Sequence, residues 1–183
     1  MHESLELLKE EIIDCKKCDL CKTRKNSVPG KGSKNAQIIF VGEAPGRTED
    51  INGEPFVGSA GKKLTDALEN AGITREMVYI TNIVKCRPPK NRQPTENERK
   101  ECEAYLKNEF ALIKPNIICL LGNTAYKTIL GGSEISKNHG KLVKKDDLTY
   151  FITFHPAAVI YNQKLVKDFE NDIKKIVGLL KEK

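Results

Sequence analysis

Residues 37–61 read QIIFVGEAPGRTEDINGEPFVGSAG, and this stretch decides the fold. Residues 38–41 form a short apolar run bounded by turn residues, which is typical of a strand covered on both faces. Glu43 follows that run, and Pro45 disfavours helical backbone for the residue before it, so the chain stays extended where the strand ends. Ser59 then begins a predicted helix. The stretch predicts a strand, a polar loop and a helix, with a carboxylate held at the junction; a solvated turn without chemistry is the alternative.

Strand and helix patterns alternate along the rest of the chain. Apolar runs typical of strands recur at residues 78–84, 117–121 and 149–154, and a helical pattern follows each of them. This alternation predicts an α/β protein, a three-layer α/β/α sandwich with a central, mostly parallel four-stranded sheet. At 183 residues and 39% hydrophobic, the chain suits one domain, residues 1–183, in which the segment 1–36 contributes to a cysteine cluster. Residues 133–148 have no strong pattern and fit a hairpin.

Four polar side chains lie at or near the ends of the predicted strands. Glu43 follows the first strand, and Asn82 lies in the second half of the second strand. Asn123 follows the third strand, and His155 follows the fourth. Open α/β sheets bind ligands where the carboxyl ends of their strands meet, so we expect these side chains to converge. The alternatives are that Asn82 is a core amide bonded to backbone and that His155 is structural.

The cysteines point to a thiolate site. Five of the six form a C-x2-C-x2-C run and a separate C-x15-C pair, namely Cys15, Cys18, Cys21, Cys86 and Cys102. Thiolate ligands favour zinc or an iron–sulfur cluster, and the spacing leaves both open, with unrelated buried thiols as the alternative. Cys21 fits either a ligand or a spare thiol. Cys119 lies inside an apolar run and is expected to be a core thiol.

The net charge of +6 is unevenly distributed. Lysines and arginines gather in residues 16–34, where only Asp19 opposes them. Such a block favours a polyanionic partner, although a solvated basic face is an equal alternative on charge alone. Neither a signal peptide nor an apolar run of membrane-spanning length is visible, so a cytoplasmic location without membrane association is expected.

The predicted constellation suits cleavage of the bond between a sugar and a nucleobase. That reaction builds positive charge on the sugar, which Glu43 can stabilise while it orients or activates water. The departing base gains negative charge, and His155 can donate a hydrogen bond to its oxygen. Asn82 can accept from a ring N–H and donate to a carbonyl, which fits uracil and mismatches cytosine. Phe56 offers a face on which an extruded base can stack.

Five motifs together resemble the family 4 uracil-DNA glycosylases. They are GEAPG at 42–46, PFVG at 55–58, ITN at 80–82, KCRPP at 85–89 and HPAA at 155–158. The likeness runs from about residue 15 to the final helix and includes the cysteine spacing. Related family 5 enzymes lack the acid of the first motif, so Glu43 favours family 4.

The resemblance implies roles for individual residues. It implies a structural [4Fe-4S] cluster held by Cys15, Cys18, Cys86 and Cys102. It also implies Glu43 and His155 as catalytic residues, and a set of uracil contacts comprising Gly42, Glu43, Glu49, Phe56, Asn82 and His155. Glu49 would lie near uracil C5 and crowd a thymine methyl group.

Two surfaces are candidates for contact with DNA. The candidate phosphate contacts are Ser59 with the amides near it and four basic loop residues, Lys85, Arg87, Lys90 and Arg92. For the four loop residues, the alternative is charge that is only solvated. The segment after His155 departs from many relatives, and a wedge into the duplex would use Val159, Ile160 or Tyr161. No histidine lies between residues 86 and 94, so ordinary turnover is expected rather than covalent trapping.

The function implied is DNA repair. The enzyme would excise uracil from single- and double-stranded DNA by hydrolysing the N-glycosidic bond, leaving an abasic site that starts base excision repair. Replication or repair proteins are candidate partners, and a monomer is expected. The competing hypothesis is a non-catalytic iron–sulfur module for nucleic-acid binding or redox chemistry, which predicts a redox-active centre and no base release.

Overall fold

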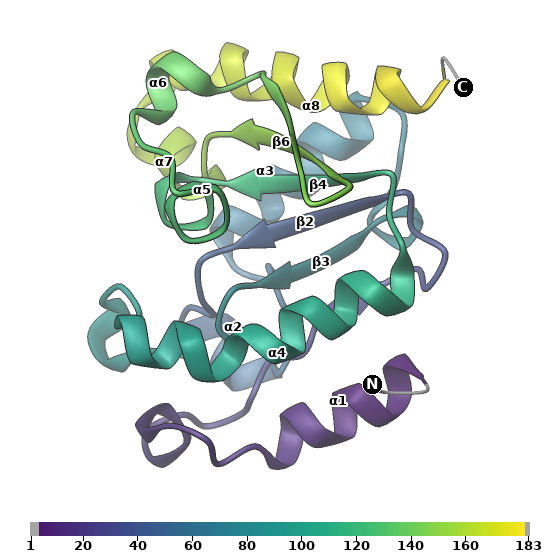
Figure 1. The fold of residues 1–183 in the computed structure, drawn as a ribbon. Helices are drawn as coiled ribbons and strands as arrows, with labels where there is room; N and C mark the ends of the chain where they lie inside the picture. The colour runs from purple at the N-terminus through teal and green to yellow at the C-terminus, as the bar shows by residue number, and fades with distance from the viewer. Residues whose placement is uncertain (1–3, 182–183) are drawn as a thin grey trace.

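The computed structural model describes residues 4–181 and contains one six-stranded mixed sheet (Figure 1). Across the sheet the strands run β1 (Lys31–Gly32), β3 (Tyr79–Asn82), β2 (Ile38–Gly42), β4 (Ile117–Leu121), β6 (Leu148–Thr153) and β5 (Leu142–Lys145). The four inner strands are parallel, whereas β1 and β5 pair antiparallel at the two edges.

The α/β class and the four parallel strands are confirmed, but the expected strand number was wrong. The two additional strands carry no buried apolar run: β1 has two exposed residues, and β5 is largely exposed. Strand prediction relies on apolar patterning, so edge strands of this kind are not visible in the sequence. β5 and β6 form a hairpin, but it begins at Leu142 and extends to Thr153, past the expected residues 133–148, whose first part contains the short helix Ile135–Asn138.

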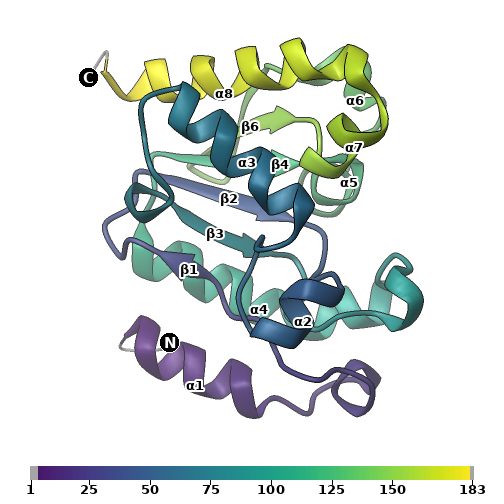
Figure 2. The same ribbon diagram turned by 180° about the vertical axis from the view of Figure 1, so that it is seen from behind.

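Helices cover both faces of the sheet. α4 (Glu96–Ile113) lies in front of the sheet in Figure 1 and packs against α1 (Leu5–Asp14). α3 (Ser59–Asn70) and α8 (Val166–Lys181) cover the opposite face, which Figure 2 shows from behind, and α7 (Pro156–Tyr161) packs against both.

Shorter elements complete the chain. α2 (Arg47–Asn52), α5 (Asn123–Leu130) and α6 (Ile135–Asn138) are short α-helices, and single 3-10 turns lie at Asp19–Lys22, Arg75–Met77, Pro89–Asn91 and Gln163–Leu165. Within residues 4–181, no helix is both long and apolar enough to cross a membrane.

Local sequence signals explain where the long helices begin. Ser4 caps α1 by accepting a hydrogen bond from the Leu7 amide at 3.2 Å. Thr95 and Glu98 form a capping box at the start of α4, with reciprocal hydrogen bonds of 3.2 and 2.8 Å.

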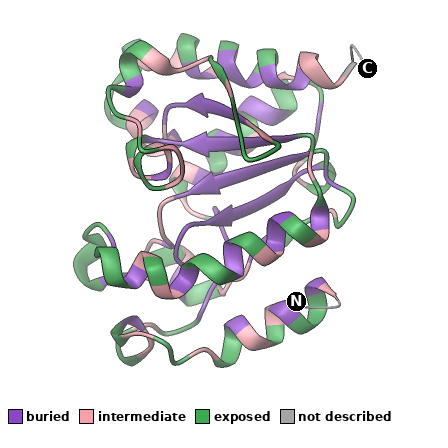
Figure 3. Cartoon of the chain, in the orientation of Figure 1, coloured by how far each residue is buried: buried purple, intermediate pink, exposed green. Residues whose placement is uncertain are grey.

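Two apolar cores lie on the two faces of the sheet. The inner strands are almost wholly buried (Figure 3), and every residue of β2 is buried. Successive side chains of β2 point alternately into the two cores, so that Ile38 and Phe40 pack on the α3–α8 side and Ile39 and Val41 on the α4 side. This packing fixes the four parallel strands and brings their carboxyl ends to a common edge.

Candidate active site

A pocket of about 320 Å³ lies at the carboxyl edge of the parallel strands. Its lining includes three of the four strand-end residues expected to converge, Glu43, Asn82 and His155, together with Phe56. These residues come from the loops after β2 and β6 and from the end of β3, so the predicted convergence is confirmed for Glu43, Asn82 and His155. Asn123, the other strand-end residue, is exposed at the start of α5 and is absent from the lining.

Glu43 is held by a neighbour that the sequence did not single out. The hydroxyl of Thr124, on α5, donates a hydrogen bond to Oε2 of Glu43. The Glu43 carbonyl also accepts from the Val84 amide at 3.3 Å, which ties the loop to the residues after β3. Thr124 comes shortly after β4 and therefore lies at the same sheet edge as Glu43. Its position after a predicted strand was the feature of the sequence that could have identified it as a site residue. The carboxylate is therefore fixed in the pocket instead of rotating freely in solvent.

Phe56 adopts an uncommon backbone conformation. Its φ is +52°, a left-handed value that costs free energy for a bulky side chain. The Arg75 guanidinium donates to the carbonyls of Pro55 and Phe56 at 2.9 and 2.8 Å, and thereby holds this turn. Gly61 is required beneath it, because a Cβ at that position would lie 1.8 Å from the Phe56 carbonyl oxygen. The ring of Phe56 lies 5.7 Å from that of His155, measured between centroids.

Asn82 presents an unpaired acceptor. Its side chain is 1% exposed, and its Oδ1 atom has no hydrogen-bond partner. Buried carboxamide oxygens are normally bonded, so the orphaned atom requires an explanation. A Cβ at Gly42 would lie 2.5 Å from Oδ1 and 2.5 Å from the edge of the Phe56 ring, so glycine keeps this corner open. A ligand N–H would satisfy the acceptor, and the alternative of a core amide whose oxygen is bonded to backbone is wrong.

His155 is held in its neutral form. Burial lowers the pKa of His155 to about 4, although the nearby Glu49 carboxylate acts in the opposite direction. Its Nδ1 atom accepts a hydrogen bond from the Ala157 amide at 3.1 Å. A neutral imidazole that accepts at Nδ1 carries its proton on Nε2. His155 is therefore a neutral hydrogen-bond donor.

Glu49 organises the loop around the pocket. Its carboxylate accepts from the amides of Gly46, Val57 and Gly58 at 3.1, 3.0 and 2.8 Å. These bonds join the start of α2 to the segment that enters α3. Glu49 does line the pocket, and its two oxygens also hold the loop in place.

The expected phosphate contacts divide into two groups. Lys85 was wrongly placed among them, because its side chain is 1% exposed and pairs with Glu109 on α4. Arg92 lines the pocket, where it donates to Glu98 at 2.8 and 2.6 Å. Arg87 and Lys90 are exposed or partly exposed on the same loop, and Ser59 lines the pocket at the start of α3, so these residues remain predictions.

The three residues expected to form a wedge differ in their exposure. Val159 is 2% exposed and belongs to the core, so it is unavailable for insertion and that part of the expectation was wrong. Ile160 is partly buried, whereas Tyr161 ends α7 with 89% of its side chain exposed. Because α7 is helical, the side chains of these neighbouring residues point to different sides of the helix. Their positions in the sequence alone do not show which of them faces solvent.

Five cysteines surround one cavity. It is lined by Cys15, Cys18, Cys21, Cys86 and Cys102, brought together from the N-terminal segment, the loop after β3 and α4. All six cysteines are free thiols, and Cys119 is a buried residue of β4, as expected. Burial raises the pKa of Cys86 to about 12, although the Arg24 guanidinium, 2.8 Å from its sulfur, acts in the opposite direction. Within residues 4–181, no three or more Cys, His, Asp or Glu side chains are placed to hold a single metal ion.

Comparison with known proteins agrees with this geometry. The sequence model of the uracil DNA glycosylase superfamily matches residues 29–181. A type-4 uracil-DNA glycosylase from Archaeoglobus fulgidus is 48% identical over 95% of this chain and 92% of its own length. One from Sulfurisphaera tokodaii is 48% identical over 95% of this chain and 84% of its own. A type-5 uracil-DNA glycosylase from Pyrobaculum aerophilum is 31% identical over 74% of this chain and 67% of its own. The chain therefore belongs to the uracil DNA glycosylase superfamily and, within it, to the type-4 enzymes.

Proposed function

We propose that this protein excises uracil from DNA by hydrolysing the N-glycosidic bond and leaving an abasic site, the first step of base excision repair. The observation that carries this proposal is a single pocket lined by Glu43, Phe56, Asn82 and His155. The names of the type-4 relatives support the same reaction.

Base recognition follows from Asn82 and Phe56. The unpaired Oδ1 of Asn82 accepts the N3–H of uracil, while its amide group donates to the adjacent carbonyl. Cytosine has an acceptor at ring position 3, so it would leave the Asn82 oxygen without a donor. The base stacks on Phe56, whose ring already contacts His155. Glu49 lies beside this pocket, and its proposed role against a thymine methyl group rests on that location.

Bond cleavage uses Glu43 and His155. The Glu43 carboxylate, oriented by Thr124, stabilises the developing sugar cation and orients the attacking water. His155 donates its Nε2 proton as a hydrogen bond to the uracil oxygen, which gains negative charge as the bond breaks. A neutral donor suits this role because burial of His155 opposes a charged imidazolium.

We propose that the thiol cavity holds an iron–sulfur cluster. Its five thiols come from three separate elements and line one cavity. Thiolate-only sites favour zinc or an iron–sulfur cluster, and the likeness to the type-4 enzymes favours a [4Fe-4S] cluster with Cys15, Cys18, Cys86 and Cys102 as the proposed ligands. Cys21 lines the same cavity as the fifth thiol. The cluster would be structural, since it would tie the N-terminal segment to the body of the domain.

The substrate is uracil-containing DNA, both single- and double-stranded. Phosphates would be bound by Arg87, Lys90, Arg92 and the amides at the start of α3 near Ser59. Ile160 and Tyr161 would meet the duplex beside the flipped base. The protein would act as a monomer, with replication or repair proteins as candidate partners.

The decisive experiment measures abasic-site formation on oligonucleotides that contain one uracil. Wild-type protein should cleave single-stranded and duplex uracil substrates, and thymine and cytosine controls should stay intact. Glu43→Gln and His155→Gln should each lose about a hundredfold or more in rate while they retain DNA affinity. Normal turnover by both variants would overturn the assigned roles, and no uracil release by wild-type protein would overturn the function.

A further inference from the structure

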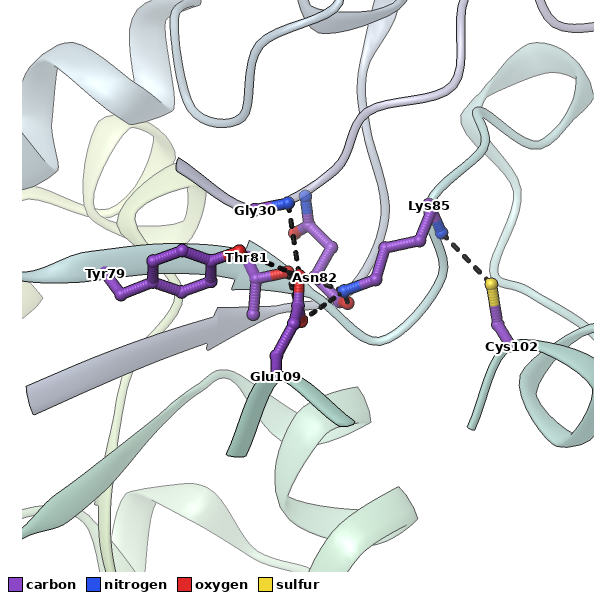
Figure 4. Close-up of polar contacts among 7 residues, drawn as sticks. All are labelled: Gly30, Tyr79, Thr81, Asn82, Lys85, Cys102 and Glu109. Atoms are coloured by element: carbon purple, nitrogen blue, oxygen red, sulfur yellow. Dashed lines mark hydrogen bonds and ion pairs between the residues drawn. The ribbon is translucent and has the colours of Figure 1, made fainter. Parts of the chain in front are cut away.

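A buried ion pair lies beside Asn82, one of the residues that line the base pocket (Figure 4). The Lys85 ammonium lies 2.7 Å from Oε2 of Glu109, and the two side chains are 1% and 0% exposed. Buried ion pairs are poor sources of stability, because desolvation of two charges offsets most of their attraction. The proposed chemistry uses neither residue, so their retention in the core requires another reason.

Lys85 uses all three of its donors. Besides Glu109, its Nζ atom donates to the Thr81 hydroxyl at 2.6 Å and to the main-chain carbonyl of Asn82 at 2.9 Å. An ammonium group has three N–H donors, so each one is satisfied. One of them is bonded to the residue whose side chain faces the pocket.

Glu109 fixes Lys85 from the opposite side. Its carboxylate also accepts from the Thr81 and Tyr79 hydroxyls at 2.9 and 3.2 Å and from the Gly30 amide at 3.2 Å. Burial and the adjacent carboxylate raise the pKa of Tyr79, which keeps its hydroxyl a donor. The ion pair is therefore embedded in a network with little freedom to move.

The network replaces missing strand pairing at the end of β3. β1 pairs with β3 only at Tyr79 and Ile80, so it stops before Thr81 and Asn82. On the other side, Asn82 is opposite Gly42 of β2, and the Ile83 amide donates to the Gly42 carbonyl at 2.9 Å. The Lys85 ammonium thus donates to the Asn82 carbonyl at a point of β3 that β1 does not reach.

Lys85 also joins this strand end to the cysteine cavity. Its main-chain amide lies 3.4 Å from the sulfur of Cys102, and its carbonyl accepts from the Val28 amide at 2.7 Å. Its side chain folds back toward Asn82, as Figure 4 shows. One residue thus bonds to the wall of the cysteine cavity and to the base-reading residue.

We propose that Lys85, held by Glu109, is a positioning residue that fixes Asn82 for recognition of uracil. This proposal rests on the proposed function, in which Asn82 recognises the uracil base. Removing the ion pair frees the Asn82 carbonyl and lets the carboxamide leave its place beside Gly42. Binding of the DNA backbone does not involve this network, so the loss falls on base recognition and turnover.

The test is a double-mutant cycle between the ion pair and Asn82. Lys85→Met/Glu109→Gln removes both charges and keeps the side-chain lengths, and Asn82→Ala is made in that background and in wild type. The paired change alone should lower kcat on a uracil oligonucleotide and weaken inhibition by free uracil, each about tenfold, with DNA affinity unchanged. Asn82→Ala should then cost a much smaller factor in the paired background than in wild type.

Two further variants separate positioning from loss of stability. Thr81→Val removes only the hydroxyl that Lys85 and Glu109 share, and should give a smaller loss in the same direction. Ile176→Ala creates a cavity in the core beneath α8, lowering the melting temperature without changing kcat or uracil inhibition. Visible absorbance retained in the paired variant would show that the cysteine loop is intact.

The outcomes distinguish this proposal from the function on which it rests. If Asn82→Ala costs the same factor in both backgrounds, or if the paired and Thr81→Val variants keep wild-type kcat and uracil inhibition, Lys85 does not act through Asn82. The proposed function then stands. If wild-type protein releases no uracil, the function itself fails.

Discussion

At the scale of single residues, the pocket depends on groups that hold the reacting side chains. Thr124 orients Glu43, the Ala157 amide sets the tautomer of His155, and Arg75 holds the turn at Phe56. None of these partners was identified from the sequence, because each one is distant along the chain or acts through the backbone. Their effect is to reduce the motion of the groups that would touch the substrate.

Thr124→Val should lower kcat about fivefold, because it removes one hydrogen bond that orients Glu43 and keeps nearly the same shape. The measurement is single-turnover uracil release at saturating enzyme. Thr128→Val is the matched control on the exposed side of the same helix and should keep the wild-type rate. Equal rates for the two variants would argue against a role for the Thr124 hydroxyl.

The low pKa of His155 predicts a specific pH dependence of stability. The unfolded chain binds the imidazole proton near pH 6.5, whereas the folded chain resists it until about pH 4. The unfolded state therefore binds more protons in this window, and the folded state should lose stability as the pH falls from about 6.5 toward 4. His155→Gln should remove this pH-dependent part of the free energy of unfolding. Urea unfolding of wild type and variant from pH 7 to pH 4.5 measures the difference.

An NMR titration of the His155 ring provides an independent check. The ring should stay neutral, with its proton on Nε2, down to about pH 5, so its protonation should not limit kcat between pH 8 and 5. A midpoint near 6.5 would contradict both the neutral donor and the predicted stability difference.

At the scale of elements, α7 separates a buried face from an exposed tip. His155 caps the helix, Val159 enters the core, and Tyr161 projects from the last turn. Because α7 packs against α3 and α8, its exposed end has a fixed position relative to the pocket mouth. An exposed aromatic side chain at the end of a packed helix is suited to enter a base stack.

Tyr161→Ala should reduce uracil release about tenfold more on duplex DNA than on single strands, since a wedge helps only where a stack must be opened. The ratio of kcat/KM on the two substrates measures this effect. Leu142→Ala removes an exposed apolar side chain on β5 and serves as the control, which should leave the ratio unchanged. Equal losses on both substrates would mean that Tyr161 contributes to general affinity instead.

At the scale of the whole molecule, the cysteine cavity links distant parts of the chain. It joins the segment after α1 to the loop after β3 and to α4, and Arg24 adds bonds to Cys86 and to the carbonyls of Ile13 and Cys15. A cluster bound there would cross-link three elements, and its free energy of binding would add to the stability of the fold.

Cys18→Ser should therefore reduce bound iron and acid-labile sulfide and lower the melting temperature of anaerobically prepared protein by several degrees, about 5 °C or more. Cys119→Ser is the matched control, because this buried thiol lies in β4 away from the cavity, and it should keep full iron content. Stoichiometric zinc in the wild-type protein, or unchanged iron in Cys18→Ser, would contradict the proposed ligand set.

Apolar runs and the residues that follow them were sufficient to predict the four parallel strands and the place of the pocket at their carboxyl ends. Each buried parallel strand needs a continuous apolar segment, and its carboxyl end must lie at the common edge of the sheet. Glu43, Asn82 and His155 could thus be assigned to one site from the sequence. The exposed strands β1 and β5 could not, because neither carries that segment.

Burial of individual polar residues was decided by the tertiary structure alone. Lys85 and Arg92 lie in one basic loop and look equivalent in the sequence, yet Glu109 approaches only Lys85 across the core. Val159 and Tyr161 likewise differ only through the turn of a short helix. The sequence by itself determined which chemical groups meet at the sheet edge, because each buried parallel strand is marked by an apolar run and the residues that end it lie at the shared carboxyl edge. Only the folded chain decided which charges face solvent, because that depends on partners many residues away.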